Sequence, residues 1–124
     1  MAVEIEGNSV TSTGTSLSNP AGKWDAPVAV LVDDNTGSSG EATMLAFRGL
    51  DRSRSFGSPT AGYASTNSVF DFPDGSALLI TQAWDKARTG EVFGEDPVPP
   101  DTHTRPDEAA ATAKAWLGAE YGCK

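Results

Sequence analysis

A continuous run of apolar residues occupies positions 27–32 and stops at Asp33 and Asp34. Because both faces of such a segment are apolar, the run predicts a buried, central strand of a parallel sheet. Residues 41–50 then show apolar side chains at helical spacing, which predicts a helix packed on that sheet. These side chains are Ala42, Leu45, Ala46 and Leu50.

A β-hairpin gives the clearest turn signal in the second half of the chain. Residues 68–72 and 77–83 are the predicted strands, and a Pro-Asp-Gly turn joins them. Proline presets φ and glycine accepts a positive φ, so this tripeptide has a physical reason to turn. A short strand over residues 54–56 and a loop of small residues over 58–66 are expected to precede the hairpin.

The C-terminal segment predicts one more helix. Residues 85–100 show no periodicity and are expected to be irregular. Thr104 and Asp107 have the spacing of a capping box, which predicts a helix over residues 106–120. Its apolar side is expected to consist of Ala110, Ala113, Trp116 and Leu117.

The first 25 residues differ in composition from the rest. Residues 2–6 alternate and predict a short strand, whereas residues 7–25 are rich in Gly, Ser, Thr and Asn and predict a loop. We therefore divide the chain into an N-terminal strand and polar loop (1–25) and an α/β part (26–124).

Composition excludes several classes of function. The chain has 124 residues, nine basic and seventeen acidic, with a net charge of −8. This charge argues against binding to nucleic acid or anionic membranes. No apolar stretch approaches the length of a membrane span, and the N-terminus has no signal-peptide pattern, so the compartment stays open. Cys123 and His103 are the single cysteine and histidine, so neither a Cys/His metal site nor a cofactor is predicted.

Ser38 stands in a turn between the predicted strand 27–32 and the predicted helix. A strand that breaks at glycine and restarts as a helix exposes a hydroxyl among unpaired backbone N–H groups, which favour negative charge. Acyl transfer needs such donors for its oxyanion. The competing interpretation is a helix-capping serine.

Several segments in order match one family of enzymes. They are residues 26–32 (APVAVLV), 36–42 (TGSSGEA), 55–62 (SFGSPTAG), 72–78 (FPDGSAL), 88–90 (RTG) and 100–101 (PD). Together they resemble the C-terminal half of the catalytic domain of tail-specific, or C-terminal-processing, serine peptidases, in the branch near the tricorn core and the retinoid-binding-protein repeats. The resemblance implies an α/β fold of the crotonase and ClpP type, with a β-α-β core, a β-hairpin and a C-terminal helix.

The resemblance also implies peptide-bond hydrolysis through an acyl-enzyme. Ser38 falls on the nucleophile, and the amide of Gly37 or of a neighbouring turn residue, Ser39, falls on the oxyanion hole. Ser39 is also a rival hydroxyl, one place past the nucleophile position. Glu41 is expected to support the N-terminus of the helix rather than to act as a base.

The general base is missing from both expected places. Tail-specific peptidases use a lysine where this chain has Tyr63, and tricorn-like relatives use a histidine from an earlier position, yet no histidine precedes Ser38. Tyr63 is expected either to hold substrate near Ser38 or to pack. His103 is expected at the surface.

Two acidic residues are further candidates for the site. Glu95 and Asp96 are candidates to orient an incoming histidine, as an acidic residue does in triads, or else are solvated loop charges.

Two principal hypotheses follow. The first is a serine peptidase acting on peptides or unfolded protein through Ser38, with its base supplied by an upstream subdomain or another copy of the chain. The second is a non-catalytic module of the same fold that binds peptides or small ligands. Acyl-CoA chemistry is a third reading of the fold class, with no sequence feature in its favour.

Overall fold

The computed structural model describes residues 4–6, 10–11 and 26–124. In chain order the elements are β1 (Glu4–Glu6), β2 (Val10–Thr11), β3 (Val28–Val32), α1 (Ser39–Phe47), β4 (Ser53–Gly57), β5 (Ser65–Asp71), β6 (Ala77–Lys86), β7 (Val92–Phe93), β8 (Thr102–His103) and α2 (Pro106–Tyr121). The predicted α/β class is therefore confirmed, as are the main elements of the second half.

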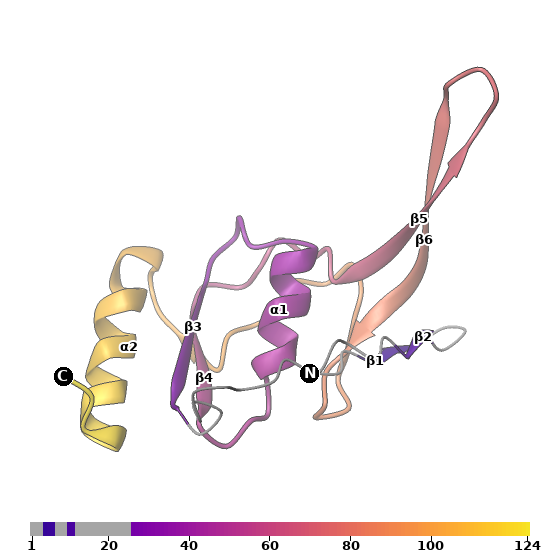
Figure 1. Cartoon of the computed structure of the whole chain (residues 1–124). Coiled ribbons are helices and arrows are strands. Elements are labelled where there is room, and N and C mark those ends of the chain that lie inside the picture. Colours follow the sequence, from indigo (N-terminus) through magenta and orange to yellow (C-terminus); the bar gives the residue numbers. More distant parts are fainter. Residues whose placement is uncertain (1–3, 7–9, 12–25) are drawn as a thin grey trace.

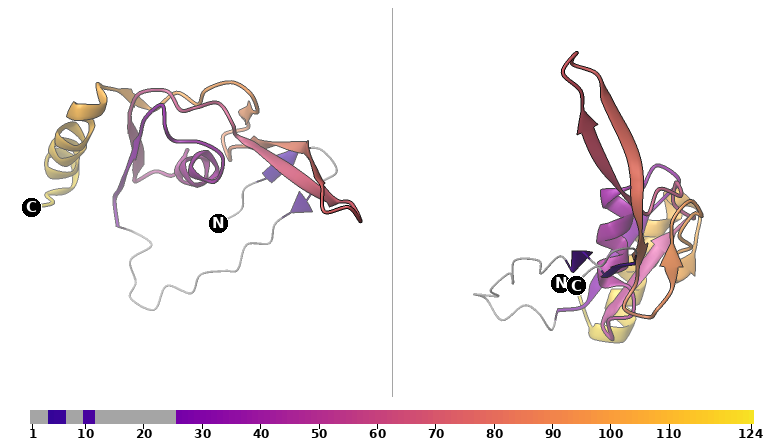
Figure 2. Two further views of the ribbon diagram at one scale, coloured as in Figure 1. Left: turned by 90° about the horizontal axis from the view of Figure 1, so that it is seen from above. Right: turned by 90° about the vertical axis from the view of Figure 1, so that its right-hand side faces the viewer.

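A small parallel sheet with a helix on each face forms the body of the molecule. The sheet has the order β3-β4-β8, and both neighbouring pairs are parallel. Two views at right angles show α1 and α2 on opposite sides of β3 and β4 (Figures 1 and 2). The β3–α1–β4 unit is the β-α-β core that the sequence predicted, because a parallel pair needs a crossover connection.

The position of β3 in the sheet differs from the prediction. Among the described strands β3 pairs with β4 alone, so β4 is the central strand. Leu31 is 51% exposed, although the apolar run predicted burial on both faces. An apolar run is equally compatible with a central strand and with an edge strand whose second face is partly open, so periodicity alone did not separate them.

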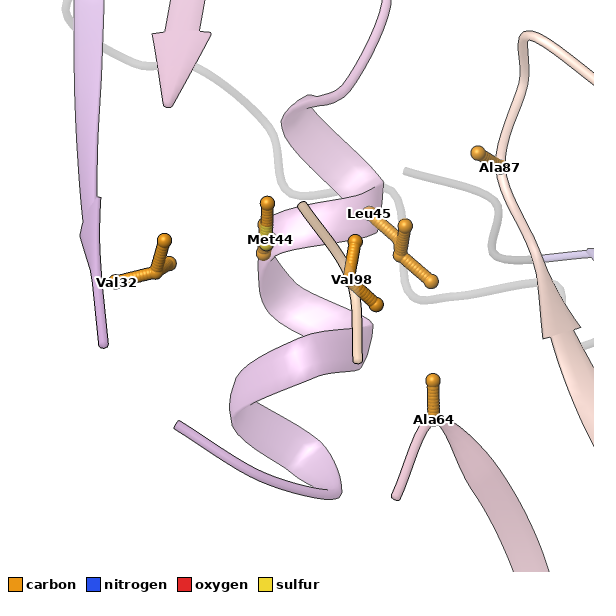
Figure 3. Packing of buried hydrophobic residues seen from close by; sticks show 6 residues of the cluster. All are labelled: Val32, Met44, Leu45, Ala64, Ala87 and Val98. Carbon is orange, nitrogen blue, oxygen red and sulfur yellow. The ribbon is translucent and has the colours of Figure 1, made fainter. Parts of the chain in front are cut away.

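One hydrophobic cluster lies between α1 and the segments that surround it. Met44 and Leu45 of the helix are buried with Val32, Ala64, Ala87 and Val98 (Figure 3). The predicted burial of Leu45 and Ala46 is confirmed. Leu50 is exposed, because the helix ends at Phe47 and Arg48 is already extended.

A second cluster lies between α2 and the other face of the sheet. Phe56 packs there with Ala109 and Ala113, and Trp116 covers the cluster at a ring-centroid distance of 5.5 Å from Phe56. Ala113 and Trp116 are thus on the packed side as predicted, whereas Ala110 is exposed. The capping-box prediction is wrong, since Arg105 is the N-cap and provides no side-chain cap.

The second sheet carries a long hairpin that projects from the body. Its order is β2-β1-β6-β5, with β7 paired to the end of β6. We call β5, β6 and their turn the arm; it extends beyond the helices in Figure 1 and in both views of Figure 2. The predicted hairpin is confirmed, and Gly75 adopts a φ of 83° in its turn.

Three loop predictions are wrong in part. The first is the loop 58–66, because β5 already begins at Ser65. Val10–Thr11 forms β2 inside the predicted loop 7–25, and β6 and β7 extend into the predicted irregular segment 85–100. The strand predicted over residues 2–6 is confirmed at Glu4–Glu6, and the remaining predictions for the N-terminal part lie outside the described residues. Across the described ranges, neither helix is long and apolar enough to cross a membrane.

Candidate active site

The chain leaves β3 through a tight polar turn that ends beside the start of α1. Thr36 donates its N–H to the carbonyl of Asp33 (3.0 Å), and its Oγ1 accepts the Asp33 N–H (3.1 Å). The Asp33 carboxylate in turn accepts the N–H of Asn35 (3.0 Å). These bonds fix the path that delivers Gly37 and Ser38 to the carboxyl end of the parallel strands, where open α/β sheets place their sites.

Ser38 has an unusual backbone conformation. Its φ of 51° and ψ of −114° make it the one residue other than glycine with a positive φ among those described. Such a conformation costs about 1–3 kcal/mol and is held by the surrounding structure. Ser38 is exposed at the N-cap of α1, whereas Ser39 is already the first residue of the helix. A strained serine on a strand-to-helix turn is the geometry of a nucleophile elbow.

The backbone amides around Ser38 are not equally available. Ser38 donates its N–H to Glu41 Oε2 (2.8 Å), and Gly40 donates to the carbonyl of Gly37 (2.9 Å). The N–H groups of Gly37 and Ser39 meet no acceptor within the described residues. These two amides, at the positive end of the helix dipole, are therefore the donors open to a developing oxyanion.

Glu41 is the centre of the local hydrogen-bond network. Its side chain is 0% exposed. The carboxylate accepts four hydrogen bonds, from Ser38 N (2.8 Å), Tyr63 N (2.8 Å), Gly62 N (2.8 Å) and Thr60 Oγ1 (2.5 Å). A carboxylate has about four acceptor sites, so Glu41 is saturated and its role is structural. The sequence predicted support of the helix N-terminus, but not the second link, which joins the serine turn to the loop at residues 60–63.

Thr60 and Gly62 form the other side of this link. Thr60 Oγ1 accepts the Val98 N–H (2.8 Å) while it donates to Glu41. A Cβ at Gly62, which has a φ of 87°, would stand 2.8 Å from the carbonyl oxygen of Glu95. The loop therefore contacts the 95–98 segment closely at this point. Thr60 lies inside the matched segment 55–62, which was the signal that could have identified it.

Tyr63 lies beside the serine turn. Its Cδ2 is 3.4 Å from the position of a Cβ built on Gly37, and the residue is 65% exposed. It therefore lines the open side of the turn and contributes little to the core. This location is compatible with the predicted contact to substrate.

The remaining predicted site residues make no hydrogen bond to Ser38 among the described residues. Glu95 and Asp96 are exposed, and the backbone of Glu95 is the part that contacts Gly62. His103 is exposed as expected but belongs to β8, paired with Gly57. Because Gly57 pairs in turn with Val32, two strand spacings, about 10 Å, separate His103 from the end of β3.

A second buried carboxyl group lies near this network and was not predicted. Asp85 is 3% exposed in β6. Burial, followed by repulsion from the Glu41 carboxylate, raises the pKa of Asp85 above its usual value. Its folded-state pKa exceeds the unfolded one, so the ionised group opposes folding as pH rises through that range. Asp85 therefore marks a place where the fold tolerates an unfavourable charge next to the site.

The sequence model of peptidase family S41 matches residues 3–104. Nisin-resistance protein of Lactococcus lactis subsp. lactis is 40% identical over 117 residues, which are 93% of this chain and 36% of that protein. The chain therefore spans about a third of that relative.

Solved structures resemble the described fold. A lipoprotein from Streptococcus agalactiae superposes with a TM-score of 0.70 and 34% identity, over 76% of this chain and 32% of that one. The photosystem II D1 C-terminal processing protease superposes with a TM-score of 0.57 and 30% identity, over 65% of this chain and 21% of that one. The described residues thus adopt the same fold as part of the C-terminal processing protease.

Proposed function

The chain is a member of peptidase family S41, a family of hydrolases, and from this premise we propose that it provides the nucleophile of a serine peptidase, Ser38. One observation carries the proposal: Ser38 sits in a strained conformation at the start of α1, between two amides that meet no acceptor in the described part of the chain. The free amides suit acyl transfer, and the positive φ distinguishes Ser38 from a serine that merely caps a helix, whose backbone is usually extended.

In the proposed reaction Ser38 Oγ attacks the carbonyl carbon of a peptide bond, and its proton passes to a general base. The amides of Gly37 and Ser39 donate to the tetrahedral oxyanion, where one such donor contributes about 10²–10³-fold to rate. Collapse breaks the C–N bond, the amine leaves with the proton, and water then hydrolyses the acyl-Ser38 ester.

No general base is identified among the described residues. No hydrogen bond joins Ser38 to a histidine or a lysine there, and the Glu41 carboxylate already accepts four donors. We propose that the base comes from polypeptide outside this chain or from another copy, in line with relatives about three times as long. Peptides or unfolded protein segments are the proposed substrates.

A specific observation supports the alternative, a peptide-binding module without catalysis. Tyr63 occupies the place at which the resemblance calls for a lysine base, and its phenol lacks an amine that desolvation could render basic. The exposed arm beside the site would serve such a module equally well.

Intact-mass analysis after exposure to a fluorophosphonate distinguishes the two functions. In labelling, Ser38 Oγ attacks phosphorus and fluoride leaves, which requires an activated hydroxyl. When the chain is mixed with a base-carrying segment of a longer relative, we expect one label per chain, absent in Ser38→Ala, retained in the distant control Ser53→Ala, and mapped by tandem mass spectrometry to Ser38 rather than Ser39. Catalysis would be refuted if the folded chain stayed unlabelled even when mixed with a base-carrying segment of a longer relative. The peptide-binding module would then be the remaining hypothesis.

A further inference from the structure

The arm exposes apolar side chains on both of its faces. Val69 and Leu79 are cross-strand neighbours on one face, and Phe70 and Leu78 are neighbours on the other. All four are exposed. Two strands alone bury too little apolar surface to be stable in water, so an apolar surface of this kind indicates a binding partner.

The outer edge of β5 carries free backbone groups. Phe72 donates its N–H to the carbonyl of Ser76 (2.9 Å), which identifies this cross-strand pair as hydrogen-bonded. Bonded and non-bonded pairs alternate in an antiparallel ladder, so the N–H and C=O groups of Val69 and Asp71 point away from β6. No described strand pairs with that edge.

The edge begins beside the proposed nucleophile. Tyr63 and Ser38 both donate their N–H groups to the same oxygen, Oε2 of Glu41, at 2.8 Å. Ser65, the first residue of β5, donates to the carbonyl of Tyr63 (2.8 Å). A strand placed along β5 is thereby directed to the serine turn.

The surroundings of the edge are acidic. Between Ser55 and Asp85 the chain contains no lysine or arginine, and the arm exposes Asp71 and Asp74. Hydrogen bonds from Ser76 lower the pKa of Asp74, which favours its ionised form. A partner that complements this surface has basic and apolar side chains.

We propose that the outer edge of β5 is a docking site for an extended peptide with apolar and basic side chains, which adds to the sheet as one more strand. Its backbone pairs with Val69 and Asp71, and alternate side chains lie on the two apolar faces of the arm. The inference deepens the proposed function, on which it rests for the direction toward Ser38; the docking itself requires no catalysis.

Binding of fluorescein-labelled synthetic peptides to the full chain tests this inference, in the Ser38→Ala background so that cleavage plays no part. The probes are an alternating Leu/Lys peptide of about ten residues and its Leu/Glu counterpart. We expect the basic peptide to bind at least about tenfold more tightly at low salt, with the difference shrinking as salt is added.

The variants Val69→Pro and Val69→Ala separate backbone pairing from simple apolar adhesion. Proline removes the outward N–H, which an edge strand tolerates, and we expect it to weaken binding of the basic peptide about tenfold. Alanine shortens the side chain but keeps the N–H, and we expect a change below about threefold. Circular dichroism checks that both variants are folded.

A basic peptide in which every backbone amide is N-methylated gives a test that leaves the protein unaltered. Strand addition predicts that this probe fails to bind the Ser38→Ala chain. Binding of the N-methylated probe, equal loss from proline and alanine, or tighter binding of the acidic peptide would each overturn the proposal. Fluorophosphonate labelling of the unsubstituted chain in the presence of a base-carrying segment, together with failed docking, refutes the docking site alone. Docking without labelling under the same conditions refutes catalysis alone.

Discussion

Ser38 is held in a backbone conformation that glycine adopts freely and a residue with a Cβ does not. The bonds around it explain how the strain persists: the Asp33–Thr36 turn fixes one side, and the Ser38–Glu41 hydrogen bond fixes the other. A residue retained in a strained position has a role other than stability, which is why this position supports the assignment of the nucleophile.

Replacing Ser38 by glycine tests this strain directly. We expect Ser38→Gly to be about 1 kcal/mol more stable than Ser38→Ala. Glycine relieves about 1–3 kcal/mol of backbone strain at the positive φ, which outweighs its larger loss of conformational entropy on folding. Urea denaturation of the two variants measures the difference. A glycine variant less stable than the alanine variant would show that the positive φ carries no strain.

At the scale of elements, one buried carboxylate joins α1 to the loop that precedes β5. Glu41 receives donors from the serine turn and from residues 60–63, so the two sides of the site are positioned by the same group. At the other end of α1, Arg48 makes two hydrogen bonds to Glu91 and a third to the carbonyl of Pro99. The helix is thus tied at both ends to segments that are distant in sequence.

Glu41→Gln should lower the free energy of unfolding by about 3 kcal/mol or more. The glutamine amide presents an NH₂ group to two of the four donors, which leaves buried polar groups unsatisfied. The matched control is Thr60→Ser, which keeps the donating hydroxyl and should cost less than about 1.5 kcal/mol. Denaturant titrations of both variants provide the comparison. Similar small losses would show that the four hydrogen bonds to Glu41 do not hold the two sides of the site together.

Across the whole molecule, burial is concentrated on the two faces of the parallel sheet, and the arm lies outside both clusters (Figure 1). Phe56 is 1% exposed between β4 and α2, whereas Phe70 is 47% exposed on the arm. The same residue type therefore contributes to folding at one position and to the molecular surface at the other.

The contrast between these phenylalanines yields a stability prediction. Phe56→Ala should cost about 3–5 kcal/mol, because it opens a cavity between sheet and helix. Phe70→Ala should cost less than about 1 kcal/mol, because its side chain leaves an exposed strand. Thermal unfolding followed by circular dichroism measures both, and a large loss at Phe70 would show that the arm is part of the core.

The sequence predicted the strand–turn–helix at Ser38 and the hairpin because each has a local cause: an apolar run, a glycine-containing turn, and a Pro-Asp-Gly tripeptide. It did not predict the edge position of β3 or the short strands β2, β7 and β8, since pairing partners are set by tertiary structure. Glu41 illustrates the same limit within the site. Its contact with Ser38 at the start of the helix spans three residues, so a local sequence pattern can predict it. Its contacts with Thr60 and Gly62 span about twenty positions, and no local pattern predicts them.

The four hydrogen bonds to Glu41 also affect how members of this family are recognised from sequence. Ser38 contributes a backbone N–H, which any residue except proline supplies, so these bonds place a demand on the glutamate and not on the serine hydroxyl. A search based on the turn and the glutamate will consequently retrieve working enzymes together with descendants that have lost catalysis. Genomic counts of such peptidases should therefore be made on the serine and on the base, which these hydrogen bonds do not require.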